Sequence, residues 1–254
     1  MTVSLDEVVS YHLPVGGSRI DLNPRIGQPI SLRYAGLIHC IKCGRETKKS
    51  FGQGFCFPCF RSAPEASECI LGPELCRAHD GEARDMAWAR KHCLQEHVVY
   101  LAKSSAVKVG ITRNTQIPTR WIDQGASEAV VFARTPNRYT AGVIEVALKA
   151  HLTDRTNWRR MLKNEICDDD LLAFKDRLRG ELARDLTQYV DEDDAVWRIN
   201  YPVQVFPEKV KSVGFDKQPA IDGTLLGIKG QYLLLNDDRV LNIRKHQGYE
   251  VDVS

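Results

Sequence analysis

The chain has 254 residues, of which 43% are apolar, and it carries a formal net charge of +2 at pH 7. This length and apolar content suffice for one large core or two to three smaller ones, which excludes a predominantly disordered chain. No apolar run approaches the roughly 20 residues of a membrane-spanning helix, and the first residues lack the basic start and apolar core of a signal peptide. We therefore expect a globular, cytoplasmic protein without a membrane partner.

The basic residues concentrate in the middle of the chain. Residues 97–165 hold eleven lysines and arginines against five acidic residues, so the nearly neutral total conceals a cationic segment. The acidic runs at 168–170 and 191–194 restore the balance, and we expect them to cover solvated helix ends or loops. This distribution keeps nucleic acid among the partners, although the net charge alone does not indicate it.

The first predicted element is a strand over residues 28–38, which contain many β-forming residues and lead directly into a cysteine pair. Seven of the eight cysteines lie between residues 40 and 93. In a chain without a signal peptide this density indicates metal ligation in preference to disulfides, because the cytosol keeps thiols reduced. Cys167 lies apart from the others, and we expect an ordinary core or surface thiol there.

Two C-x-x-C pairs form the first predicted metal site. Each pair turns tightly enough to direct two thiolates at one ion, and the four ligands are Cys40, Cys43, Cys56 and Cys59. A site closed by four sulfurs is structural, so we expect Zn²⁺ here without a catalytic role. The module is too small for a core of its own, and we expect four phenylalanines to pack around it: Phe51, Phe55, Phe57 and Phe60.

A second sulfur-rich set follows the first. Its ligands are Cys69, Cys76, Cys93 and His97, with His79 and His92 as competing ligands. A helix that begins near Glu82 would carry Cys93 and His97 on successive turns, because residues four apart face the same side. This set predicts a second Zn²⁺ site, and the alternative is three buried thiols beside ordinary histidines.

A β-hairpin is predicted next, from residues 98–103 and 107–113, which are both rich in β-branched side chains. Pro118 is well placed at the start of a short helix that carries Arg120 next to Trp121. The neighbouring indole is expected to hold the guanidinium in position.

An amphipathic helix is predicted over residues 140–152, with an apolar stripe of Ile144, Leu148 and Leu152 that faces a core. Glu145 lies beside that stripe. Asn157 precedes a second helix that starts near Trp158, and a polar helix is predicted over residues 169–189.

At these residues the chain resembles the GIY-YIG nuclease superfamily, whose pattern is a tyrosine-bearing strand, a glycine-bearing strand, a helix-borne arginine and a later helix-borne glutamate. The positions that match are Val98-Val99-Tyr100, Lys108-Val109-Gly110, Arg120, Glu145 and Asn157. The whole chain is also similar to an uncharacterised bacterial family that joins cysteine knuckles to such a domain. Its marks are residues 107–113, 119–125 and 156–158.

The resemblance implies a metal-dependent endonuclease that acts on DNA or RNA. Glu145 would hold one Mg²⁺ or Mn²⁺ ion, and Arg120 would bind the phosphate oxygens with its planar fork. Tyr100 would activate water as a general base, while Lys108, which replaces the second tyrosine, would contact phosphate. Further backbone contacts are expected from Lys103, Arg113, Arg155, Arg159 and Arg160.

Each of these residues also has an ordinary structural interpretation. Tyr100 fits a core aromatic, Glu145 fits an exposed ion pair with Lys149, and Asn157 fits a helix cap. The first alternative function is therefore a catalytically inactive DNA-, RNA- or ribonucleoprotein-binding module in which Lys108 marks lost chemistry. The second is a protein-interaction adaptor.

The chain closes with β-forming segments at residues 223–236 and 239–244, joined by the acidic turn Asp237-Asp238. Short strands at opposite termini need partners for their edges, so we expect them to pair with the N-terminal strand. The sequence thus predicts an α+β fold in five parts: an N-terminal β segment (1–38), a zinc-binding module (39–96), a central GIY-YIG-like α/β domain (97–165), a helical connector (166–200) and a C-terminal β module (201–254).

Overall fold

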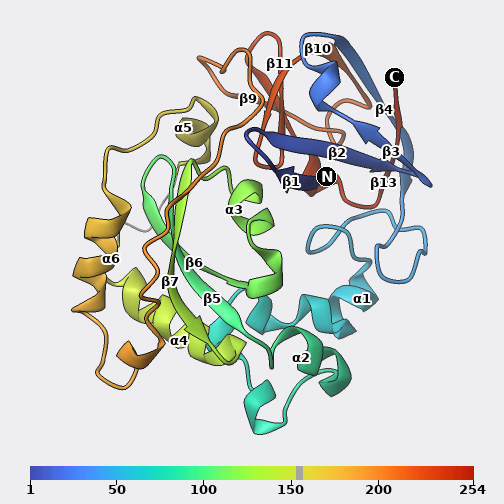
Figure 1. Ribbon diagram of the computed structural model, residues 1–254. Helices are drawn as coiled ribbons and strands as arrows, with labels where there is room; N and C mark the ends of the chain where they lie inside the picture. Colours follow the sequence, from blue (N-terminus) through green and yellow to red (C-terminus); the bar gives the residue numbers. More distant parts are fainter. Residues whose placement is uncertain (153–156) are drawn as a thin grey trace. The chain divides into compact units, whose positions relative to one another are not determined.

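The computed structural model describes residues 1–152 and 157–254 (Figure 1). These residues form two compact units. The first unit comprises residues 1–62, 122–125 and 199–254. The second comprises residues 63–121 and 126–198, so the cysteine-rich block contributes to both units. Among the described residues, none of the helices is long and apolar enough to span a lipid bilayer.

The first unit is built on two sheets. The smaller sheet is an antiparallel meander of β1 (Thr2–Leu5), β2 (Val9–Val15) and β3 (Ser18–Asp21). The larger sheet has the strand order β13-β4-β10-β11-β12-β9. Its strands are β4 (Pro29–Ile38), β9 (Lys211–Val213), β10 (Ala220–Lys229), β11 (Tyr232–Leu235), β12 (Arg239–Asn242) and β13 (Tyr249–Val253).

The expected pairing of the two ends of the chain is confirmed by the larger sheet. β4 lies between β10 and β13 and is antiparallel to both, with Leu32 opposite Ile221 on one side and Val253 on the other. Ile30 and Leu32 are buried on one face of β4, and the alternation of the strand places its polar residues on the other. Asp237 has a φ of 60° and Asp238 a φ of 64°, which close the tight turn between β11 and β12.

The second unit contains a four-stranded sheet of order β6-β5-β7-β8. Its strands are β5 (His97–Lys103), β6 (Val107–Arg113), β7 (Glu128–Thr135) and β8 (Trp197–Arg198). The predicted hairpin is thus present, with Tyr100 directly opposite Gly110. All four strands are antiparallel to their neighbours.

Six α-helices and eight short 3₁₀ turns are described in residues 1–152 and 157–254. The α-helices are α1 (Phe57–Ser62), α2 (Met86–His92), α3 (Thr119–Asp123), α4 (Arg138–Lys149), α5 (Trp158–Leu162) and α6 (Leu171–Arg179). The 3₁₀ turns are Asn23–Arg25, Pro64–Ala66, Glu68–Ile70, Pro73–Leu75, Ala78–Asp80, Asn114–Gln116, Thr187–Tyr189 and Ile243–His246.

The core of the second unit lies between its sheet and the helices α4 and α6. Val99 and Leu101 of β5 pack there with Ile144 and Leu148 of α4, and Leu152 is partly buried against them, as the amphipathic pattern predicts. Leu178 adds the contribution of α6. The alternate residues of β5 face away from α4 and toward Trp121, because successive strand side chains point to opposite faces.

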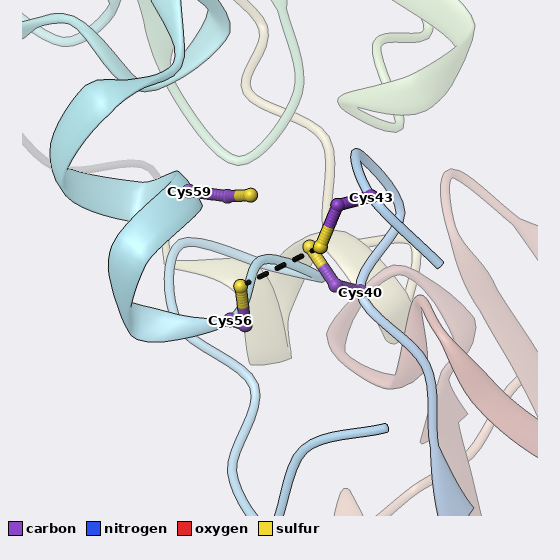
Figure 2. Close-up of side chains that lie close together, drawn as sticks. All are labelled: Cys40, Cys43, Cys56 and Cys59. Carbon is purple, nitrogen blue, oxygen red and sulfur yellow. Dashed lines mark hydrogen bonds between the residues drawn. The ribbon is translucent and has the colours of Figure 1, made fainter. Parts of the chain in front are cut away.

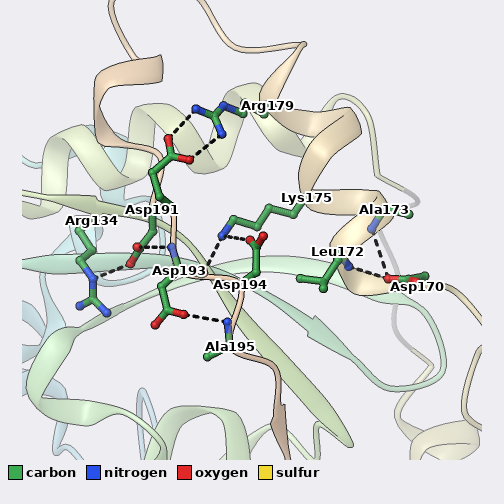
Figure 3. Close-up of polar contacts among 11 residues, drawn as sticks. Arg134, Asp170, Leu172, Ala173, Lys175, Arg179, Asp191, Asp193, Asp194 and Ala195 are labelled. Carbon is green, nitrogen blue, oxygen red and sulfur yellow. Dashed lines mark hydrogen bonds and ion pairs between the residues drawn. The ribbon is translucent and has the colours of Figure 1, made fainter.

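The acidic run at 191–194 stabilises the second unit through specific contacts (Figure 3). Asp191 accepts a hydrogen bond from Arg134 Nε at 2.6 Å, and the buried Lys175 donates to Asp194 Oδ1 at 2.8 Å. Asp170 caps α6 by accepting from the backbone of its first turn. α6 ends at Arg179, so the polar helix is shorter than the predicted 169–189 because the chain turns at Gly180.

Candidate functional site

The first four cysteines come together at one point of the first unit. Their sulfur atoms all lie within 4.8 Å of one another, and the Cys43 and Cys56 sulfurs are 3.8 Å apart. Figure 2 shows Cys40 and Cys43, from the loop after β4, facing Cys56 and Cys59 at the start of α1. In a tetrahedral zinc site with bonds of about 2.3 Å, neighbouring sulfurs are about 3.8 Å apart. The arrangement is therefore already the size of a four-thiolate zinc site.

The local backbone explains this geometry. Gly44 donates its N–H to the carbonyl of Cys40 at 2.8 Å and has a φ of 72°, which turns the first pair sharply. Phe51 and Phe55 exchange two backbone hydrogen bonds of 2.9 Å and bring the second pair back toward the first. Burial raises the pKa of Cys40, but backbone N–H donors of Cys56, Cys43 and Lys42 outweigh it and lower that pKa to about 6. Such donors favour the thiolate form that a metal needs.

The second group contains three cysteines in the second unit. The sulfurs of Cys69, Cys76 and Cys93 lie within 4.8 Å of one another, and Cys76 and Cys93 are buried. Hydrogen bonds with the other two thiols lower the pKa of Cys76. The three thiols also line a cavity of about 500 Å³ whose wall includes charged side chains of Glu68, Arg77, Glu82, Arg84 and Asp85. These residues could hold a metal ion with three thiolates.

The prediction that Cys93 and His97 share a helix is wrong. α2 begins at Met86, capped by Asp85, and ends at His92, and His97 is the first residue of β5, where it pairs with Arg113. The helix ends because the chain must extend to enter the sheet, so the four-residue spacing does not place both side chains on one helical face.

The imidazole of His97 nevertheless fits a ligand. Its Nδ1 lies 2.7 Å from the carbonyl oxygen of Gln95, and its buried Nε2 has no hydrogen-bond partner among residues 1–152 and 157–254. Burial lowers its pKa to about 4, which keeps the ring neutral, as metal ligation requires. His97 does not belong to the group of atoms within 4.8 Å, so the structure brings together the three sulfurs alone.

The two competing histidines have other contacts. His79 stacks on Tyr139 with ring centroids 4.2 Å apart, and His92 stacks on Trp88 at 4.1 Å. The Nδ1 of His92 also lies 2.8 Å from the Trp88 carbonyl oxygen. Neither histidine belongs to the three-sulfur group found in the described part of the chain.

Tyr100 lies in the second unit, on the face of the sheet opposite the α4 core. It is fully buried, and its ring meets Trp121 edge-on with centroids 6.0 Å apart. A Cβ added at Gly110 would lie 2.6 Å from the Tyr100 hydroxyl oxygen, so the glycine of the second triplet makes room for the phenol. Lys108 is on the same face as Tyr100, because it lies two residues from Gly110 on β6.

The positive charge of Arg120 affects the pKa values of Lys108 and Glu145, the two remaining ionisable residues of the predicted site. Burial and, as the smaller effect, the positive charge of Arg120 together lower the pKa of Lys108 to about 8. For Glu145, burial is the largest effect and raises the carboxyl pKa, whereas the charge of Arg120 lowers it. The charge of Arg120 therefore acts on both Lys108 and Glu145.

Glu145 is 7% exposed on α4, which is unusual for a carboxylate. Lys149 pairs with it at 3.3 Å, one turn farther along the helix. Glu74 raises the Glu145 pKa and so lies nearby. A buried carboxylate between a cation and a second carboxylate differs from the exposed pair that helix spacing alone suggests, and it is the kind of oxygen ligand that a divalent cation prefers.

The three-cysteine group is attached directly to the helix that carries Glu145. Arg138, the first residue of α4, donates its N–H to the Cys93 carbonyl at 2.9 Å and its guanidinium to the Cys69 carbonyl at 3.3 Å. Gly142 then packs against the 3₁₀ turn Pro73–Leu75 between Cys69 and Cys76. The sequence patterns missed Arg138 and Glu74. A glycine inside a helical pattern was the available signal of a close backbone approach.

Asn157 is observed as a helix cap. Its side-chain oxygen accepts from the N–H of Arg159 at 3.0 Å and of Arg160 at 3.4 Å, and its own N–H donates to Ser105 Oγ at 3.0 Å. These contacts occupy the amide oxygen of Asn157, so its observed role is that of a helix cap.

The lysines and arginines expected to bind phosphate differ in their neighbours, which are carboxylates for some and an aromatic ring for another. Lys103 lies 3.4 Å from Glu128, and Arg160 lies 2.7 Å from Glu165. Arg159 stacks over Trp158 at 4.4 Å from the ring centroid, and Arg113 is half-buried. Arg155 lies outside the described residues.

Comparison with known proteins gives one match. The model of the family described as "Protein of unknown function (DUF2797)" matches residues 27–251. No curated protein and no solved structure matches the chain.

Proposed function

The chain belongs to the DUF2797 family, and we propose that it is a zinc-containing nucleic-acid-binding protein whose second unit cleaves phosphodiester bonds with the help of a divalent ion. The observation that carries this proposal is the position of Arg120, which acts electrostatically on both Lys108 and Glu145. Tyr100 lies on the same sheet face as Lys108. These residues match the GIY-YIG pattern in order along the chain.

Each residue has a chemical task in this proposal. Magnesium or manganese bound at Glu145 would supply a Lewis acid that polarises the scissile phosphate. Arg120 binds two phosphate oxygens and stabilises the negative charge that grows as water attacks phosphorus and the ester oxygen leaves. Lys108 adds a second positive charge. The Tyr100 hydroxyl orients the attacking water, or its deprotonated phenolate form accepts the proton that the water loses. Burial of the Tyr100 and Glu145 side chains strengthens these interactions, because charges interact more strongly where the effective dielectric constant is low.

The cysteine groups serve as scaffolds in this proposal. The first holds zinc with Cys40, Cys43, Cys56 and Cys59, and the second holds zinc with Cys69, Cys76 and Cys93. His97 completes the second set of ligands in this proposal. The spacing of the sulfurs supports the first site, and the unpartnered buried Nε2 supports His97 as the fourth ligand of the second. Through Arg138, the second zinc would stabilise the start of the helix that bears Glu145.

One assay tests the enzyme directly. Wild-type protein and Glu145→Gln are incubated with mixed single- and double-stranded DNA and RNA, with magnesium or manganese, and binding and cleavage are read together. We expect cleavage by the wild type and by the control below but not by Glu145→Gln, at equal binding. Glu181→Gln is the matched control, because Glu181 is an exposed carboxylate of the same unit that lies 3.8 Å from His151. Cleavage that survives Glu145→Gln would refute the assignment of this residue.

A catalytically inactive binding module is the second candidate. The Glu145–Lys149 ion pair favours it, because a carboxylate already paired with a cation binds metal less readily. The replacement of a tyrosine by Lys108 points the same way. In that case no substrate is cut with either metal, and binding is unchanged by Glu145→Gln.

A further inference from the structure

Three phenylalanine rings form an unusual surface on the first cysteine module. Phe57 is 52% exposed and Phe60 is 38% exposed, and both rings lie beside Phe51, with centroids 5.4 and 6.2 Å from it. Only Phe55 is buried. Of the four phenylalanines expected to pack around the module, the other three therefore lie together and partly exposed at its surface. We name Phe51, Phe57 and Phe60 the aromatic face.

The backbone holds these rings in place. Phe57 and Phe60 are three residues apart on α1 and so face the same side of the helix. A Cβ added at Gly52 would lie 2.8 Å from the Phe60 ring, and Gly52 has a φ of 52°. The loop therefore uses glycine where the ring needs room. Exposed rings held in this way are available to stack on a planar partner.

Positive charges surround the aromatic face. Residues 40–62 contain five lysines and arginines and a single acidic residue, Glu46. Lys49 lies 5.4 Å from the centroid of the Phe51 ring. Lys48, Lys49 and Arg61 form no ion pair with a carboxylate within the part of the chain that the structure describes. Arg45 differs, because the Cys43 side chain raises its pKa and its charge also interacts with Cys56 and Cys59.

We propose that the aromatic face binds unpaired nucleotides, whose bases stack on Phe57 and Phe60 while Lys48, Lys49 and Arg61 contact the phosphates. This inference rests on the proposed function, from which it takes nucleic acid as the class of ligand. It adds that the nucleic acid is single-stranded and that it binds to the first unit. Exposed rings flanked by cations suit this ligand because each base offers a planar face and each nucleotide a negative charge. Bases inside a duplex are already stacked on their neighbours, so a duplex can use the cations but not the rings.

The test measures binding without cleavage. Full-length, zinc-loaded Glu145→Gln protein is titrated, without magnesium or manganese, into labelled oligothymidylate, oligouridylate and a duplex of the same length, and anisotropy is recorded. Phe57→Leu combined with Phe60→Leu keeps an apolar surface but removes the rings. We expect single-strand affinity to fall by about tenfold or more, with little change for the duplex.

Two further variants complete the experiment. Phe174→Leu is the matched control, because Phe174 is an aromatic ring of the second unit with Arg177 stacked over it at 4.2 Å, and we expect it to have no effect. Lys48→Gln with Lys49→Gln should reduce the slope of log affinity against log salt by about 1.4 on a single strand. Zinc content, measured with a chromophoric chelator, verifies that each variant keeps its fold.

Several results would overturn the inference. One is that the parent Glu145→Gln protein binds no single strand. Another is that the two leucine substitutions leave its single-strand affinity unchanged. The third is that zinc-loaded variants lose equal affinity for the single strand and the duplex. An aromatic face that instead binds a protein would tolerate leucine and show no salt-dependent affinity for oligonucleotides. Cleavage is measured separately on wild-type protein. If no cleavage is found, the binding result for the aromatic face still stands, and if the aromatic face does not bind single strands, the cleavage result still stands.

Discussion

Gly142 of α4 lies directly against the backbone of Glu74, so closely that an added Cβ would be 2.3 Å from the Glu74 nitrogen. This contact joins the loop between two cysteines of the second group to the helix that carries Glu145. A backbone atom cannot move aside as the end of a side chain can. The contact therefore makes the position of Glu145 depend on the loop that the cysteines organise.

Gly142→Ala is expected to destabilise the protein by about 1–3 kcal/mol, because the methyl group forces the helix away from the loop. This cost exceeds the gain of about 1 kcal/mol that alanine normally brings to a helix interior. Urea unfolding followed by tryptophan fluorescence measures the difference. Gly17→Ala is the control, because nothing lies within 4 Å of an added Cβ there. Equal stability of the two variants would contradict the close packing.

Each cysteine group is expected to hold one zinc ion. Cys59→Ser should remove the ion of the first group and Cys76→Ser that of the second, while Cys167→Ser retains both, because Cys167 belongs to neither group. Native mass spectrometry counts the ions.

His97→Ala should lower zinc occupancy at the second group and leave the first unchanged, because we propose its unpartnered Nε2 as the fourth ligand. His79→Ala and His92→Ala serve as controls, since both rings stack on aromatic neighbours. The count from native mass spectrometry should fall only for the His97 variant. Full zinc occupancy in His97→Ala would show that a group other than His97 is the fourth ligand.

The stability of the protein should rise with pH above about 8 through Lys108. Its pKa is lowered from 10.5 to about 8 in the folded protein, so between these values the unfolded chain binds more protons and alkali favours folding. Lys108→Met removes this dependence, which amounts to about 1–3 kcal/mol over that interval. Urea unfolding at pH 7 and pH 10 measures it as a difference between wild type and variant. Lys229, whose pKa is also lowered to about 8, contributes equally to both proteins and cancels.

Lys149→Ala should move the acid limb of any cleavage profile to higher pH. Burial raises the pKa of Glu145 and Lys149 lowers it, so loss of the lysine raises the pKa further and the carboxylate ionises later. Because the pKa of Glu145 is raised in the folded state, its protonation favours folding at low pH. This contribution to stability is lost as the pH rises through the folded-state pKa. Lys163→Ala is the control, because Lys163 pairs with Glu165 at 2.6 Å instead. An unmoved limb would exclude Glu145 as the group that titrates.

The sequence alone determined the features that depend on short spacings and local periodicity. The paired cysteines, the hairpin that opposes Tyr100 and Gly110, the stripe of Ile144 and Leu148, and the strand pairing of the two chain ends are all present. Each follows from the pleat of a strand, the turn of a helix or the reach of a C-x-x-C loop, and these act within a few residues or on edges that must pair.

Only the tertiary structure decided how distant residues share one environment. It placed His97 on a strand instead of the predicted helix, buried Glu145 near Glu74, and left Phe57 half-exposed beside Phe51. These outcomes depend on contacts between segments tens of residues apart, whose formation is governed by packing and backbone fit across the whole unit. A periodicity identifies which face of a helix is buried, but the neighbour that covers this face is selected only when the chain folds.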